Sequence, residues 1–299
     1  MDYRQDKTDV ICLGQAVVDC ITRGRENAPD GKLAQRADSI RLSTGGDAVN
    51  ESFVLAGMGI NAELVCGLGN DLAGTIIMGE ARRRGVGTER ISIVEEMDTP
   101  VANLMVSADG SRYSVNSRAT MLPGYLPGAD AVKGARVVSF ASLFRAPLDR
   151  KETIISLIRS AWEDGAVICA DTKLPTFREL TLADISEVLP MVSYIFPNEK
   201  EAAFYTGEDS FPRMAEVFHS CGIKNVVIKA GAQGCFMSTG KDSFSLPALP
   251  VEAVDTTGAG DNFVAGFISG ILEGDGPHRC CERALAKAAE SIQHMGAVV

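Results

Sequence analysis

The chain has 299 residues, of which 45% are hydrophobic and 23% are charged, values that are ordinary for a globular protein. Its 29 basic and 39 acidic residues give a formal net charge of −10, which argues against nucleic acid or an anionic membrane surface as a partner. No apolar run approaches the ~20 residues that a membrane-spanning helix needs.

The N-terminal segment and the cysteines bear on where the protein works. Residues 1–7 are polar and lack the apolar core of a signal peptide. The eight cysteines show no Cys-x-x-Cys spacing and most lie in apolar segments, so we expect buried free thiols rather than disulfides. A soluble, cytoplasmic enzyme fits these features.

The first part of the chain contains two kinds of pattern. Short apolar runs predict buried strands, and longer segments with helical spacing predict helices. We expect strands at 10–14, 39–42 and 62–67, and helices at 47–57 and 71–84. Residues 90–116 differ, because short alternating segments around a turn at Asp109-Gly110 are typical of antiparallel strands with one face in water.

From residue 137 onward, strands and helices alternate. Strands are expected at 137–140, 166–170, 194–196 and 225–229, and helices at 149–162, 199–205 and 212–219. This alternation predicts an α/β protein with three layers (α/β/α), in which helices cover both faces of a mostly parallel sheet. We expect one domain over residues 1–299, with segments near 20–44 and 90–116 forming a small antiparallel sheet outside the main body.

The most informative segment reads Asp-Thr-Thr-Gly-Ala-Gly-Asp-Asn-Phe over residues 255–263. Apolar residues at helical spacing follow it, so a loop of small residues precedes a helix. The free N–H groups of the first helical turn attract an anion, and Gly258 and Gly260 let a phosphate approach the backbone. A carboxylate in that turn, Asp261, suits a base that takes a proton from an attacking hydroxyl. A capped helix after a tight turn would explain the glycines alone.

Together with the motifs below, this segment resembles the ribokinase-like (PfkB) family of carbohydrate kinases, from about Val10 to Ala297. In that family the Gly-Ala-Gly-Asp element carries the anion hole and the catalytic base. The resemblance implies that Asp261 is the base and that the amides of Gly258, Ala259 and Gly260 form the anion hole. It also implies that the small sheet is a lid over the sugar and that a homodimer forms through this lid.

Two earlier segments are candidates for binding the sugar. Asp19 is expected at the end of the first strand, where open α/β sheets bind ligands and where a carboxylate can accept two hydroxyls. Gly45, Gly46 and Asn50 match the family's Gly-Gly-x-x-x-Asn element, whose amide side chain can bind a hydroxyl. Many relatives carry Lys at the place of Asp47, and an acid there disfavours a substrate that already bears phosphate. A turn-forming aspartate and a loop before a helix are the structural alternatives.

Two further motifs point to the nucleotide through the resemblance. Asn198 and Glu201 match the Asn-x-x-Glu motif that orders the waters of Mg²⁺ and the phosphates of ATP; one carboxylate suffices because Mg²⁺ keeps most of its water. Helix capping is the structural alternative for this pair. Lys229, Gly231 and Gly234 resemble the strand and turn beside the nucleotide, where a simple hairpin is the alternative.

Three other assignments follow from the resemblance. Relatives often use the aspartate before the anion loop, here Asp255, to hold a monovalent cation, so K⁺ is a further candidate cofactor. Lys173 stands where such sugar kinases often have Asn, and a cation there could neutralise the transferring phosphoryl group. The helix over 284–295 is expected to form a wall of the adenine site.

These motifs predict a kinase that uses ATP and Mg²⁺ to phosphorylate a primary hydroxyl of an unphosphorylated sugar or sugar acid. Fructose or ribose is the default substrate by frequency in the family. A nucleoside or vitamin-precursor kinase of the same fold is one alternative. A sugar-binding module that has lost catalysis is another.

Overall fold

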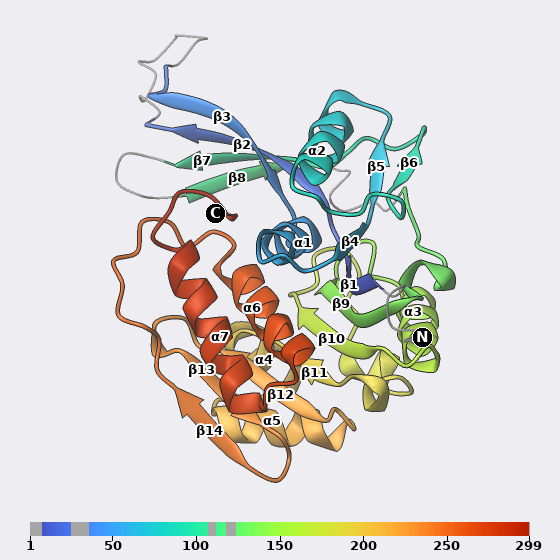
Figure 1. Cartoon of the computed structure of the whole chain (residues 1–299), viewed down its shortest axis with the longest axis vertical. Coiled ribbons are helices and arrows are strands. Elements are labelled where there is room, and N and C mark those ends of the chain that lie inside the picture. The colour runs from blue at the N-terminus through green and yellow to red at the C-terminus, as the bar shows by residue number, and fades with distance from the viewer. Residues whose placement is uncertain (1–7, 25–35, 107–111, 118–123, 299) are drawn as a thin grey trace.

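The computed structural model describes residues 8–24, 36–106, 112–117 and 124–298 (Figure 1). Its main body contains a sheet with the strand order β14-β13-β12-β11-β10-β9-β1-β4. These strands are β1 (Thr8–Leu13), β4 (Ala62–Val65), β9 (Ala135–Leu143), β10 (Val167–Thr172), β11 (Tyr194–Ile195), β12 (Asn225–Lys229), β13 (Cys235–Ser238) and β14 (Ser243–Leu246). Neighbours from β4 to β12 pair in parallel, whereas β13 and β14 are antiparallel, so the predicted mostly parallel sheet is confirmed.

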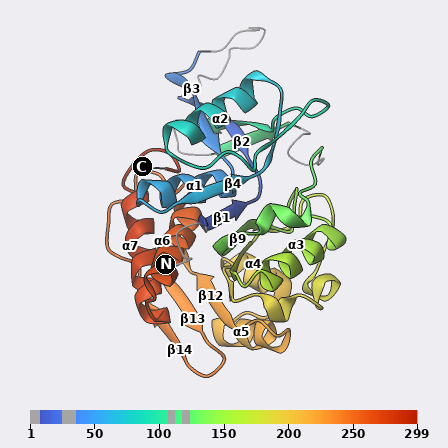
Figure 2. The same ribbon diagram turned by 45° about the vertical axis from the view of Figure 1, so that its right-hand side comes forward.

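Helices lie on both faces of this sheet, as Figures 1 and 2 show. On one face are α1 (Asp47–Gly57), α6 (Ala259–Glu273) and α7 (Pro277–Ser291), with α2 (Leu72–Arg83) extending the same apolar cluster. On the other are α3 (Lys151–Glu163), α4 (Glu199–Thr206) and α5 (Phe211–Ser220). Short 3₁₀ turns occupy Ala129–Val132, Leu182–Ile185, Leu189–Met191 and Gly231–Gln233.

Two apolar clusters hold the three layers together. Phe53 of α1 and Phe267 of α6 are buried in one cluster, and Phe140 of β9 and Phe218 of α5 are buried in the other. Burial of each large apolar side chain stabilises the fold by about 1.5–3 kcal/mol. The eight cysteines are free, as expected. Among the described helices, none is long and apolar enough to cross a membrane.

A small four-stranded sheet lies outside the main body, in the order β3-β2-β7-β8. Its strands are β2 (Val17–Arg23), β3 (Ser39–Gly45), β7 (Val101–Val106) and β8 (Arg112–Asn116). The outer pairs β2/β3 and β7/β8 are antiparallel as predicted, but the central pair β2/β7 is parallel. The segments 1–7 and 25–35 and the expected turn at 109–110 lie outside the described residues.

Two local predictions were wrong in this region. The segment 91–94 was expected in the small sheet, but β6 (Ser92–Val94) pairs in parallel with β5 (Gly67–Gly69) in a separate two-stranded sheet. Asp19 was expected at the end of the first strand, but that strand ends at Leu13 and Asp19 belongs to β2 of the small sheet. Alternation of side chains is the same in either sheet, so it did not distinguish the strand partners.

Candidate active site

The glycine-rich motif forms the start of α6. Gly258 precedes the helix with a left-handed backbone, at a φ of 73°, which favours glycine. A Cβ there would also lie 2.6 Å from the Cβ of Ala297, so the C-terminal segment closes over this position. The N–H of Ala259 donates to the carbonyl oxygen of Thr256 at 3.3 Å, and an anion would compete with that long bond.

Asp261 is in the first turn of α6 and is only 4% exposed. Its Oδ2 accepts a 2.7 Å hydrogen bond from Nδ2 of Asn50, which brings two predicted site residues into direct contact. The Oδ1 of Asn50 is buried and has no partner among the described residues, so it is available to a donor such as a hydroxyl. Burial raises the pKa of Asp261 well above its usual value, and the nearby charge of Asp47 raises it further.

Two lysines lie beside the start of α6. Nζ of Lys229 is 2.6 Å from Oδ1 of the fully buried Asp171, and a Cβ placed on Gly260 would lie 3.5 Å from the same Nζ. Lys173 contacts the other oxygen of Asp171 and one oxygen of Asp47, each at 3.4 Å. The cation expected at Lys173 therefore lies among the carboxylates at the carboxyl end of β10.

Asn198 and Glu201 form the capping box that was the structural alternative for their motif. Oδ1 of Asn198 accepts from the Glu201 N–H at 3.0 Å, and Oε2 of Glu201 accepts from the Asn198 N–H at 2.9 Å. Glu201 is 5% exposed and also accepts from the Thr172 hydroxyl at 3.2 Å. Among the described residues no group of three or more His, Cys, Asp or Glu side chains could hold a metal ion.

The strand and turn after Lys229 form a hairpin, which was the structural alternative there. Strands β12 and β13 pair antiparallel around the turn that contains Gly231 and Gly234. The hairpin nevertheless borders a pocket of about 580 Å³ that Gly260 and Ala259 also line. Its other walls are largely apolar and come from α7 and the loop before α6: Leu285, Ala288, Ala289, Ile292, Leu249, Pro250 and Val251. The expected wall from 284–295 thus lies beside the start of α6.

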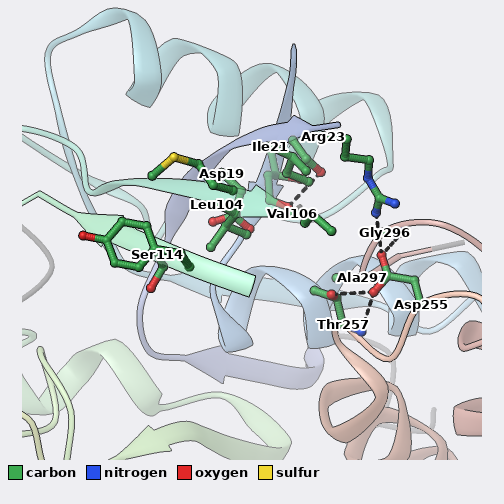
Figure 3. A pocket seen from close by; sticks show the side chains of 14 residues that line it. Asp19, Ile21, Arg23, Leu104, Val106, Ser114, Asp255, Thr257, Gly296 and Ala297 are labelled. Carbon is green, nitrogen blue, oxygen red and sulfur yellow. Dashed lines mark hydrogen bonds and ion pairs between the residues drawn. The ribbon is translucent and has the colours of Figure 1, made fainter. Parts of the chain in front are cut away.

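A second pocket, of about 380 Å³, lies between the small sheet and the loop before α6 (Figure 3). Asp19 lines it, and burial raises the pKa of this carboxyl group to about 6, with a further contribution from the charge of Asp47. A Cβ on Gly45 would lie 2.3 Å from Oδ2 of Asp19, so glycine is needed for the carboxylate to fit. Gly46, with a φ of 95°, then precedes α1, the helix that carries Asn50.

Asp255 joins the small sheet to the loop before α6 (Figure 3). Oδ1 of this 5% exposed side chain accepts from the N–H of Thr257 at 3.0 Å and from its hydroxyl at 2.7 Å, and Oδ2 accepts from the N–H of Gly296 at 3.2 Å. Nη2 of Arg23, on β2, lies 3.5 Å from the same Oδ2. Arg23 was not predicted, because nothing in its local sequence indicates a partner 232 positions away.

The two pockets border a single loop, since Thr257 lines one and Ala259 and Gly260 line the other. Between them stands a helix start with an acid in its first turn. A pocket that contains acidic side chains and a second, largely apolar pocket, joined by the loop before such a helix, are typical of an α/β phosphotransferase.

The comparisons with known proteins give the family. The model of the pfkB family of carbohydrate kinases matches residues 7–299, and the chain belongs to that family. It is 30% identical over 268 residues to the ATP-dependent ribose-1-phosphate kinase of Halopiger xanaduensis, covering 90% of this chain and 86% of that protein. It is 28% identical over 264 residues to the ribokinase of Haemophilus influenzae, covering 86% and 83%.

The fold is also that of a solved ribokinase. The Arabidopsis thaliana ribokinase complexed with ribose and ATP superimposes with a TM-score of 0.83, over 97% of this chain and 94% of that one, at 23% identity. The chain is thus a kinase of the pfkB family with a ribokinase-like fold.

Proposed function

We propose that this protein transfers the γ-phosphoryl group of ATP to a primary hydroxyl of an unphosphorylated sugar or sugar acid, with fructose or ribose as the default. The observation that carries the proposal is the 2.7 Å bond between Asn50 and Asp261 in the first turn of α6, the helix whose preceding loop lines both pockets. A buried base and a buried amide acceptor at one point suit the deprotonation of a hydroxyl.

In the proposed reaction the sugar O–H bond breaks and its proton moves to a carboxylate oxygen of Asp261. The freed oxygen forms a bond to the γ-phosphorus, and ADP leaves with the electron pair of the broken P–O bond. The N–H groups of Gly258, Ala259 and Gly260, together with Lys229, stabilise the charge on the phosphoryl oxygens. The small sheet acts as a lid that keeps water from the site.

We assign the larger pocket to ATP. Its apolar walls from α7 suit a flat base, and Lys229, Gly231 and Gly234 border the phosphates. Mg²⁺ would be held mainly by those phosphates and by water, with Glu201 and Asn198 ordering that water. Such a site needs no cluster of three protein ligands, and the described part of the chain contains none. When bound, Mg²⁺ neutralises charge on the phosphates.

We assign the smaller pocket to the sugar, where Asp19 accepts hydroxyls. The hydroxyl that reacts would reach Asp261, where Oδ1 of Asn50 can accept a hydrogen bond. The described charges favour a neutral ring: the acids Asp19 and Asp255 line the pocket, and its one arginine, Arg23, already faces Asp255. Since a relative is named a ribose-1-phosphate kinase, phosphorylated sugars belong among the substrates to be tested.

A nucleoside is a second candidate acceptor, because one observation favours it. The smaller pocket is lined by Ile21, Leu104 and Val106 beside its polar groups, and such side chains can pack against a base. A nucleoside's ribose would still reach Asp19 and Asn50. A sugar-binding module without catalysis is disfavoured, because Asp261 lies in the first turn of α6 and the amino group of Lys229 lies beside Gly260 of the same turn.

Two accessory features belong to the proposal. Asp255 would hold a monovalent cation such as K⁺, although Arg23 shares that carboxylate.

A homodimer would form through the small sheet, whose pairing register puts Ile40, Leu42 and Val115 on one face with 67%, 59% and 50% exposure. Light scattering of wild type and Leu42→Lys tests this: a dimer that becomes a monomer supports the assignment.

The test of function is an ADP-release assay with sugars, sugar acids, phosphorylated sugars and nucleosides at saturating Mg-ATP, with and without K⁺. We expect turnover with an unphosphorylated sugar or sugar acid. Asp261→Asn should lower kcat by at least ~10²-fold while leaving the binding of ATP and sugar within a few fold. Near-normal kcat in this variant would refute the base assignment, and turnover only with a phosphorylated sugar would refute the substrate class.

A further inference from the structure

An uninterrupted series of charged contacts leads from the anion hole to the proposed base. Lys229, beside Gly260, contacts one oxygen of Asp171 at 2.6 Å, and Lys173 contacts the other at 3.4 Å. Lys173 in turn lies 3.4 Å from Oδ1 of Asp47, at the first position of α1. These side chains come from β12, β10 and α1, so the series exists only in the folded protein.

The last member of this series is in contact with Asp261. Oδ2 of Asp47 accepts a 2.7 Å hydrogen bond from the Ser142 hydroxyl, and Asp47 is also hydrogen-bonded to the carboxyl group of Asp261. Two carboxyl groups that contact each other in a buried site do not both ionise readily, because their like charges repel. One proton is therefore shared between them.

The surroundings decide which carboxyl group holds the proton. Burial raises the pKa of Asp47, but the charge of Lys173 and the bond from Ser142 outweigh it and bring the pKa below its usual value. For Asp261, burial and the charge of Asp47 raise the pKa well above the usual value, and Lys173 and Asn50 only partly oppose them. These surroundings favour the shared proton on Asp261 over Asp47.

We propose that Asp47 and Lys173 are a coupled pair of positioning residues for this kinase, in which Lys173 pairs with Asp47 and Asp47 holds the carboxyl group of Asp261 that accepts the sugar proton. This inference rests on the proposed role of Asp261 as base.

The other charged groups near Asp261 do not replace this pair. Asp171, on β10, is held between Lys173 and Lys229. Glu51, on α1, is fully buried and accepts from the Ser139 hydroxyl, and burial raises its pKa well above the usual value. Burial therefore disfavours a charge on Glu51. Glu201, on α4, has Lys229, Asp171 and Lys173 as its charged neighbours.

The test compares the pH dependence of kcat/KM in three proteins. We call the fall of kcat/KM at low pH the acid limb of the profile. Asp47→Asn removes the like charge beside Asp261, so the acid limb should move to lower pH by ~1 unit. Lys173→Met removes the cation, so the limb should move to higher pH by a similar ~1 unit, and Lys173→Arg should restore it. Lys224→Met, the same change at an exposed lysine just before β12 and at the opposite end of that strand from Lys229, should leave the acid limb in place. Lys173→Gln serves if the Met variant does not fold.

A second measurement needs no catalytic activity. The folded pKa of Asp261 is raised, so the stability from its proton is present at low pH and is lost as pH rises through that pKa. The free energy of unfolding is measured by chemical denaturation at a series of pH values. The loss of stability should move to lower pH in Asp47→Asn and to higher pH in Lys173→Met. Shifts in opposite directions support the pair. Absence of a shift, or shifts in the same direction, overturns it.

The two proposals fail differently. If no tested acceptor leads to ADP release, the proposed kinase function is refuted, and the denaturation measurements alone test the coupled pair. If the wild type turns over normally and neither measurement separates the two variants, only the coupled pair is lost.

Discussion

The Nδ2 of Asn50 and the Oδ2 of Asp261 are 2.7 Å apart in the fold and 211 positions apart in the chain. One residue lies in α1 and the other in the first turn of α6, and both are almost fully buried. This contact joins the proposed sugar-binding element to the proposed base. It makes the orientation of the catalytic carboxyl group depend on the same side chain that would bind the substrate.

Asn50→Ala should therefore impair both binding and the base. Loss of a hydrogen bond to a charged or reacting group costs about 2 kcal/mol, so kcat/KM should fall by ~30-fold. The Asn50 bond lowers the pKa of Asp261, so the acid limb should also move to higher pH. Ser52→Ala is the control, because among the described residues the Ser52 hydroxyl donates to the Val49 carbonyl oxygen of its own helix and not to Asp261. An unchanged acid limb in Asn50→Ala would contradict the proposed contact.

Asp19 should give the sugar affinity a pH dependence near neutrality. Its pKa is raised to about 6, so below that pH the carboxyl group is protonated and accepts fewer hydroxyls. KM for the sugar should rise as pH falls through about 6 in the wild type. In Asp19→Asn, KM should be higher by ~10-fold and flat over the same range. Initial-rate kinetics between pH 5 and 8 check this, and equal pH profiles would remove Asp19 from the site.

The same residue should carry a stability cost. In the folded protein the pKa of Asp19 is about 6, above its ordinary value of 3.8, so the folded state binds this proton more tightly than the unfolded state does. The resulting contribution to the free energy of unfolding is fully present below pH 3.8 and is lost as the pH rises to about 6. Asp19→Asn removes this loss. The melting temperature of the variant minus that of the wild type should increase between these two pH values and then stay level. A difference independent of pH would contradict the shift.

Ala288 provides a test of the nucleotide pocket. It lines the larger pocket from α7, so Ala288→Phe should fill the space assigned to adenine. KM for ATP should rise by at least ~10-fold through overpacking, with little change in KM for the sugar. Ala286→Phe makes the same substitution at an exposed position of α7 and is the matched control. If KM for the sugar rises instead, the two pockets have been assigned the wrong way round.

Arg23 should determine how strongly K⁺ affects the enzyme. Its guanidinium group lies 3.5 Å from Asp255 and already neutralises part of the charge that a monovalent cation would balance. Arg23→Ala should lower kcat and make the remaining activity more dependent on K⁺, with partial rescue by added guanidinium. Arg41→Ala, at an exposed arginine of the neighbouring strand β3, controls for loss of surface charge. K⁺ responses that are the same in all three proteins would contradict the assignment.

The sequence by itself determined the features that rest on nearby residues. The helix at 47–57 depends on periodicity over three or four positions, so the local pattern predicted it. The cap formed by Asn198 and Glu201 is equally local, and the sequence offered it as the structural alternative for their motif. The start of α6 was predicted for the same reason. Strand and helix alternation after residue 137 was sufficient for the parallel sheet.

Only the tertiary structure decided the partners of these elements. Asp19 lies in the small sheet, β6 pairs with β5, and Lys173 faces Asp47 across the site. Each of these pairings joins segments that are far apart in the chain, and strand alternation or a lone charge is compatible with several partners. The packing of the whole chain selects one of them, because burial requires complementary shape and paired charge at every contact at once.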